Sequence, residues 1–171
     1  MTKYIVKFLT LTLTLLTLAA CGGGSGGDST TDTTKTTAPV KIALNGTLPP
    51  GTAIIGAALT LTLPDNVTPE LVSGTVAASV VTPSGVFAGG VLIPVVYKEA
   101  TPSAPGMVVI ALASSAATGV AATGEVATVS LRLTNSATPT AGSFTLDQLV
   151  TDTSGRVISG LTATVSGVTL Q

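Results

Sequence analysis

The sequence predicts an antiparallel β-sandwich of about nine strands. Apolar and polar residues alternate over short runs, most clearly at residues 59–63 and 125–133, and this period of two is that of half-buried strands. Gly, Pro, Asn and Asp interrupt the chain about every ten residues, a spacing that is typical of sandwiches. From residue 38 onward, no long segment has a convincing helical period.

Four strands are expected in the first half of the domain. They lie at residues 41–44, 54–63, 76–81 and 91–97. In the second of them we expect Leu59, Leu61 and Leu63 to face the core, because alternate residues of a strand point to opposite sides of its sheet. Pro94 interrupts the fourth strand and has no N–H to donate to a neighbour. That strand is therefore expected at the edge of a sheet or with a bulge.

Five strands are expected in the second half. They lie at residues 108–113, 125–133, 143–150, 156–158 and 161–170. The first of these is entirely apolar, which indicates a central strand that is buried on both faces. The Ala-rich stretch at residues 114–123 follows it and is expected to be a loop, because Gly119 and Gly124 disfavour a helix.

The strand at residues 125–133 has the clearest alternation in the chain. The residues expected to point inward are Ala127, Val129, Leu131 and Leu133. The residues expected to point outward are Val126, Thr128, Ser130 and Arg132. The outward set gives this strand a surface on which a partner could be recognised.

The N-terminal residues have the organisation of a bacterial lipoprotein leader. Lys3 and Lys7 flank the start of the chain, residues 8–18 are an apolar stretch with interspersed Thr, and the sequence LAAC then ends at Cys21. A charged region, a short apolar region and small residues describe a secretory signal, too short for a permanent membrane helix. We expect lipid to be attached to the Cys21 thiol.

Cleavage between Ala20 and Cys21 would remove a signal peptide of residues 1–20. Stable anchoring takes two or more acyl chains, so we expect a lipid anchor that holds the protein at a membrane of the cell envelope. Gly rather than Asp follows Cys21, which favours the outer membrane, on its periplasmic or surface side. Residues 21–37 are rich in Gly, Ser and Thr and are expected to be a flexible tether, and residues 38–171 a single folded domain.

The composition excludes most catalytic chemistry and nucleic-acid binding. The chain has no His, and its one Cys is the expected lipidation site, so the usual nucleophile–base pairs and transition-metal sites are missing. Five basic and eight acidic residues follow position 20, which provides no basic surface for nucleic acid. We therefore expect a protein that is not an enzyme and needs no cofactor.

Two groups of oxygen-bearing residues resemble parts of calcium sites. Asp147 and Asp152 precede a turn, and Asp65 lies close in sequence to Asn66 and Glu70. Calcium takes about six to eight oxygen ligands, more than either group supplies. Asp and Asn at strand ends usually cap turns, so calcium stays a secondary alternative.

Sugar binding usually requires exposed aromatic rings. The chain after Cys21 contains only Phe87, Tyr97 and Phe144, and Phe144 is expected in the core. Phe87 and Tyr97 are thus the candidates for a polysaccharide site, with Lys98 beside Tyr97. A tyrosine next to a lysine is more often the end of a strand, so both interpretations stay open.

Several segments together resemble the cohesin family. Residues 59–64, LTLTLP, resemble the LTYDP-like strand of cohesins, and residues 106–114, GMVVIALAS, resemble their central strand. Residues 124–133, GEVATVSLRL, are similar to the cohesin segment GELATITFKV. Residues 144–146 and 151–155 follow the order of the final strands. The resemblance spans residues 40–170 and implies a nine-stranded jelly roll.

The resemblance also implies a non-catalytic module that binds a protein partner through one sheet face. The candidate binding residues are Tyr97, Lys98, Thr128, Ser130 and Arg132. Two alternatives stay open. One is a carbohydrate-binding module, in which Tyr97 would stack on a polysaccharide. The other is a structural component of the envelope that assembles through the edge strand marked by Pro94.

Overall fold

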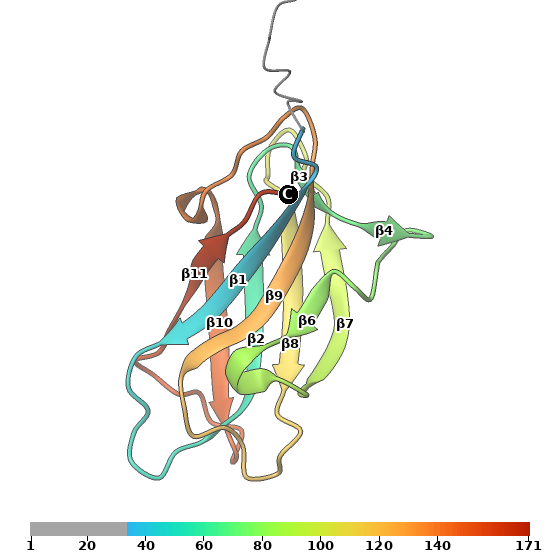
Figure 1. The fold of residues 1–171 in the computed structure, drawn as a ribbon. Helices are drawn as coiled ribbons and strands as arrows, with labels where there is room; N and C mark the ends of the chain where they lie inside the picture. Colours follow the sequence, from blue (N-terminus) through green and yellow to red (C-terminus); the bar gives the residue numbers. More distant parts are fainter. Residues whose placement is uncertain (1–33) are drawn as a thin grey trace, which may run out of the picture. The chain divides into compact units, whose positions relative to one another are not determined.

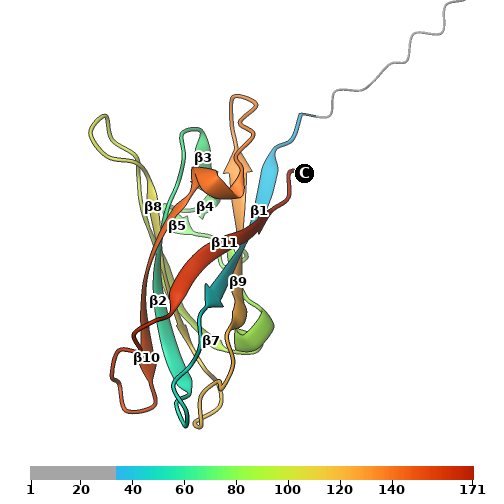
Figure 2. The same cartoon turned by 90° about the vertical axis from the view of Figure 1, so that its left-hand side faces the viewer.

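Two antiparallel sheets pack face to face in the part of the chain that the computed structural model describes, residues 34–171 (Figures 1 and 2). This arrangement confirms the predicted antiparallel β-sandwich. The described part has eleven strands rather than nine. The expected signal peptide, Ala20, Cys21 and most of the expected tether lie outside the described residues.

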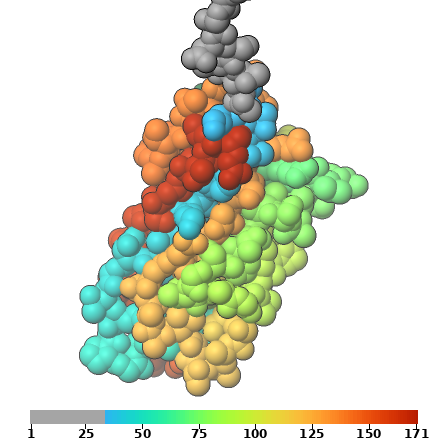
Figure 3. All heavy atoms as spheres, viewed as in Figure 1, coloured from blue at the N-terminus to red at the C-terminus, as the bar shows by residue number. Residues whose placement is uncertain are grey.

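One sheet has five strands. Its main path runs from β11 (Thr162–Val168) through β1 (Thr37–Asn45) to β9 (Gly124–Leu133). Two short strands, β3 (Val67–Pro69) and β6 (Val81–Pro83), both pair with β9. The space-filling view shows β11, β1 and β9 side by side on the outer surface of this sheet (Figure 3).

The other sheet has four strands, in the order β10 (Thr145–Asp152), β2 (Ile54–Thr62), β8 (Met107–Ala113) and β7 (Val91–Lys98). β7 lies at the edge, and its pairing with β8 shifts register between Ile93 and Val96. Pro94 lies inside this shift because it cannot donate to β8. The expected edge position and the expected bulge are both confirmed.

A small hairpin and two turns of 3-10 helix complete the fold. The hairpin consists of β4 (Leu71–Val72) and β5 (Thr75–Val76), and it projects from the sandwich in Figure 1. Its turn residues Ser73 and Gly74 have φ values of 52° and 81°, as a type I′ turn requires. The helical turns are η1 (Gly85–Phe87) and η2 (Ala141–Ser143).

The core lies between the two sheets and is wholly apolar. Among residues 34–171 no polar or charged side chain is buried. Leu59, Leu61 and Leu63 all lie in the core, as their alternation predicts. Phe144 also lies there, as expected. Every core residue belongs to the compact unit Thr34–Gln171, so this unit contains its own hydrophobic core.

The prediction that Val126 points outward is wrong. Its exposed fraction is 0%, like that of Ala127 beside it. The pairing of β9 with β1 passes from Ala127 opposite Ile42 to Glu125 opposite Ala43, which leaves Val126 as an extra residue. Such a β-bulge interrupts the alternation of the strand, and here it adds one valine to the core.

Three other strand predictions need correction. The expected strand at residues 76–81 is divided by a turn, in which Val80 N donates to Ala77 O at 3.0 Å. Residues 156–158 contribute only a single bridge, between Thr151 and Val157. β8 is central as expected but is buried on one face only, because every second residue is half-exposed. The expected loop at residues 114–123 is confirmed.

The last residues of the expected tether are part of the folded unit. Thr36 N donates to Gln171 O at 2.7 Å, and Lys35 Nζ donates to Leu170 O at 3.0 Å. β1 begins at Thr37, one residue before the expected start of the domain. In the described part of the chain no helix is long and apolar enough to cross a membrane.

Candidate binding surfaces

The outer side of the four-stranded sheet carries several exposed aliphatic side chains, and we call it the aliphatic face. It is formed by the outward side chains of β10, β2, β8 and β7. Its large members are Leu149, Val91, Ile93 and Val96, which are 50%, 56%, 51% and 53% exposed. Soluble surfaces usually cover such side chains or scatter them, so four on one sheet make this face a candidate binding surface.

Strand register assembles these side chains into rows. Leu149 lies opposite Ala58, Ala58 opposite Ala111, and Ala111 opposite Ile93. This row crosses the whole sheet without a polar side chain. It has large aliphatic groups at both edges and alanines in the centre.

The neighbouring rows become more polar toward one end of the face. Val96 and Val109 share a row with Thr60 and Asp147, and the next row ends at Lys98. Asp147 lies on the edge strand β10, and Lys98 lies on the opposite edge strand β7. The aliphatic face is therefore apolar along its row from Leu149 to Ile93 and carries one charge of each sign toward one end.

The outer side of the five-stranded sheet has different chemistry, and we call it the polar face. Lys41 Nζ donates to Glu125 Oε2 at 3.0 Å, and Ser84 Oγ donates to Glu125 Oε1 at 2.7 Å. These hydrogen bonds, chiefly that of Ser84 and then that of Lys41, hold the pKa of Glu125 below its usual value. Arg132 Nη2 donates to Glu70 Oε1 at 2.9 Å.

The structure does not bring the five predicted binding residues into one site. Thr128, Ser130 and Arg132 lie along β9 on the polar face, pointing outward as expected. Tyr97 and Lys98 lie on β7 in the other sheet. Arg132 is already paired with Glu70, and Thr128 lies between Lys41 and Thr82 in the strand register.

The prediction of Phe87 as an exposed sugar-stacking residue is wrong. Its side chain is 1% exposed, because η1 directs it into the core. Tyr97 is half-buried and packs against the core, and its hydroxyl lies close to Gly106. Burial, and secondarily the charge of Glu99, raise the pKa of Tyr97 despite an opposing hydrogen bond from the backbone of Ala100. Neither ring forms a flat exposed platform.

Each of the two groups considered for calcium contains a residue that makes other hydrogen bonds. Asp152 Oδ1 accepts hydrogen bonds from the backbone N–H groups of Ser154 and Arg156, at 2.8 and 2.9 Å. Asn66 Oδ1 accepts from Asn135 Nδ2 at 2.8 Å. Within residues 34–171 no three acidic side chains gather as metal ligands would. These residues cap turns and join loops.

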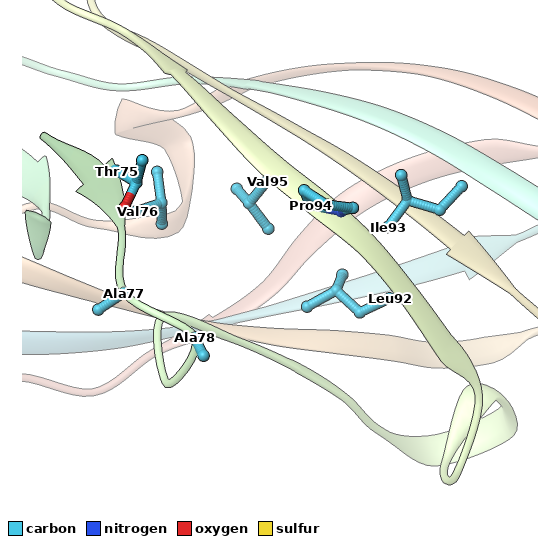
Figure 4. A pocket seen from close by; sticks show the side chains of 8 residues that line it. All are labelled: Thr75, Val76, Ala77, Ala78, Leu92, Ile93, Pro94 and Val95. Atoms are coloured by element: carbon cyan, nitrogen blue, oxygen red, sulfur yellow. The ribbon is translucent and has the colours of Figure 1, made fainter. Parts of the chain in front are cut away.

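An apolar groove runs beside the edge strand β7 and was not expected from the sequence. One part, of about 410 Å³, lies between residues 75–78 and residues 92–95 (Figure 4). A second part, of about 380 Å³, continues past Val96 and Tyr97 to Glu99. The sequence signal for both this groove and the aliphatic face is the apolar run 91–97. From the sequence this run predicts an edge or bulged strand with Tyr97 as its candidate binding residue, and not an apolar groove.

Comparison with known proteins gives a fold likeness. No protein-family model matches the sequence, and no curated protein matches it. Among solved structures, the chain is similar to a non-cellulosomal cohesin from the hyperthermophilic archaeon Archaeoglobus fulgidus. The two are 15% identical with a TM-score of 0.43, and the match covers 72% of this chain and 71% of that chain.

Proposed function

We propose that this chain is a lipid-anchored, non-catalytic binding protein of the cell envelope, whose aliphatic face recognises a protein partner. The observation that carries the proposal is the row of apolar side chains from Leu149 to Ile93 on the outer side of the four-stranded sheet. Water contact with these groups is unfavourable, and a partner with a matching apolar surface would remove it.

The chemistry of this face favours a protein over a polysaccharide. Sugars are held by stacking on aromatic rings and by many directional hydrogen bonds. The outward residues of the row from Leu149 to Ile93 are aliphatic, and they offer neither rings nor polar groups. Apolar side chains at the centre of a patch, with polar groups toward its rim, are the usual composition of protein interfaces.

The anchoring part of the proposal is supported by the sequence alone. The motif LAAC ends an apolar stretch that follows Lys3 and Lys7, as in a lipoprotein leader. A lipid on Cys21 would hold the domain at the membrane surface, on the outer membrane by the identity of Gly22. We expect labelled palmitate to be incorporated into the wild-type chain and not into Cys21→Ser; an unlabelled wild-type chain would contradict the anchor.

The binding proposal is tested by two matched double variants of the full chain. Val91→Glu with Leu149→Glu places charges on the aliphatic face, and Thr128→Glu with Ser130→Glu places the same charges on the polar face. We expect a protein captured from the native envelope to be bound about tenfold more weakly by the first variant, a loss of about 1.4 kcal/mol, and normally by the second. Circular dichroism verifies that both variants are folded.

Other outcomes would overturn the proposal. Loss of the partner with the polar-face variant alone would move the binding site to the five-stranded sheet. Recovery of polysaccharide without any protein would identify a carbohydrate-binding module.

A further inference from the structure

The outer edge of β7 has backbone groups that no strand of the described chain uses. Ser114 N donates to Ile55 O, and Leu63 N donates to Gly106 O. These two bonds set the pairing, so the even-numbered residues of β8 are the ones that bond to β2. The odd-numbered residues of β8 therefore bond to β7. Their partners are Val91, Ile93, Val96 and Lys98.

It follows that the backbone of Leu92 and Tyr97 points away from β8. Successive residues of a strand direct their N–H and C=O groups to alternate sides, and Leu92 and Tyr97 lie between the bonded positions. Both residues line the groove described above. The groove thus combines an apolar lining with unpaired donors and acceptors of an edge strand, which is the arrangement that strand addition requires.

The residues that line the groove limit the kind of segment that can bind in it. On the side opposite β7 the groove is bounded by Val76, Ala77 and Ala78, and Figure 4 shows the side chain of Val95 on the side of β7 toward Val76. The lining carries one charged residue, Glu99, at the end next to Tyr97. Glu99 has no ion pair within residues 34–171. A complementary segment is extended, has small or aliphatic side chains, and has a basic residue where it meets Glu99.

We propose that this groove binds an extended peptide segment of a protein partner, which adds to β7 as an antiparallel strand with a basic residue beside Glu99. A second copy of this chain fits less well. Suppose that the β7 strands of two copies paired antiparallel and symmetrically about the midpoint of the strand. Glu99 of one copy would then lie opposite Gly90 of the other, which offers no positive charge. Each Pro94 would also remove a donor from the shared ladder.

The groove is a separate surface from the aliphatic face. The two share Ile93 and Val96, whereas Val91 and Leu149 do not line the groove. Strand addition to β7 therefore does not require the aliphatic face to bind anything. The Val91→Glu, Leu149→Glu variant is expected to retain peptide binding, so failure of one proposal leaves the other intact.

The experiment titrates acetyl-RTVTVTG-amide and acetyl-ETVTVTG-amide into the ¹⁵N-labelled full chain. An antiparallel added strand places its N-terminal residue beside Glu99. We expect the first peptide to shift the amides of Leu92 and Tyr97 and to bind about tenfold more tightly than the second. Glu99→Lys is expected to reverse this preference.

A matched pair of variants tests the location. Ala78→Phe fills the groove and is expected to abolish binding, whereas Ser79→Phe, at the next exposed position outside the lining, is expected to preserve it. Absence of binding by both peptides, or equal binding to wild type and Ala78→Phe, would overturn the proposal. Concentration-dependent dimers that Ala78→Phe disperses would assign the groove to a second copy and overturn it as well.

Discussion

The two outer faces of the sandwich have the same backbone geometry and opposite chemistry. On the polar face, outward residues join neighbouring elements, as Lys41 does with Glu125 and Arg132 with Glu70. On the aliphatic face, outward residues such as Leu149 and Ile93 are left about half exposed. Inward alternation is common to both sheets and builds the core. The outward residues do not determine the fold, so the two faces differ in surface chemistry rather than in architecture.

The largest expected difference is between two isoleucines of the same sheet, one in the core and one on the aliphatic face. Ile110 is fully buried and Ile93 is exposed on the aliphatic face. We expect Ile110→Ala to lower the free energy of unfolding by about 2–5 kcal/mol, because it leaves a cavity in the core. Ile93→Ala should change it by about 0.5 kcal/mol or less. Urea unfolding measures both, and a similar loss in both variants would show that the aliphatic face serves stability.

A second expected effect concerns the loop that packs on the polar sheet. Gly85 has φ of 54°, and a Cβ there would collide with the carbonyl oxygen of Glu125. Gly89 has φ of 73° but open space around it. We expect Gly89→Ala to cost about 1 kcal/mol from its backbone conformation alone, and Gly85→Ala at least about 1 kcal/mol more. Thermal unfolding measures the loss of stability in both variants. Equal losses would mean that Gly85 does not pack tightly against Glu125 of β9.

Much of the core was predictable because inward alternation is a property of the local sequence. Leu59, Leu61 and Leu63 were placed correctly on that basis, and Pro94 marked the edge strand through its missing N–H. Val126 was misplaced because a bulge depends on the register with β1, which the sequence of one strand does not contain. Phe87 was misplaced because η1, and not a strand, directs its side chain.

The binding surfaces were harder to predict for a related reason. Apolar residues in a strand indicate burial in general, and they do not distinguish the core from an exposed face. What separates Val91, Ile93 and Val96 from core valines and isoleucines is only the side of the sheet that each one faces. The bulge at Pro94 changes this alternation part-way along β7. The groove depends on residues 75–78, which are close to β7 only in the folded chain.

The ion pairs of the polar face should contribute little to stability. The side chains of Arg132 and Glu70 are 60% and 44% exposed, so water and salt screen their attraction. We expect Arg132→Ala to cost about 0–1 kcal/mol, with less effect at high ionic strength. A much larger loss in urea unfolding would show that this pair fixes β3 against β9.

The smallest expected effect is on the titration of Glu125. Removing the Ser84 hydroxyl in Ser84→Ala should raise the pKa of Glu125 toward its usual value, with Ser79→Ala as the unaffected control. Because the pKa of Glu125 is lowered in the folded state, its contribution to stability is present at higher pH and is lost as the pH falls through the folded pKa. NMR titration of the side-chain carboxyl carbon measures the shift. An unchanged pKa would mean that Ser84 does not hold the carboxylate.

The measurement that tests the central claim most directly is site-specific photo-crosslinking in the native envelope. A benzophenone amino acid replaces Leu149 on the aliphatic face in one chain and Ser130 on the polar face in another. We predict a discrete protein adduct after irradiation at position 149 and none at position 130. An adduct at position 130 alone would contradict the assignment of binding to the aliphatic face.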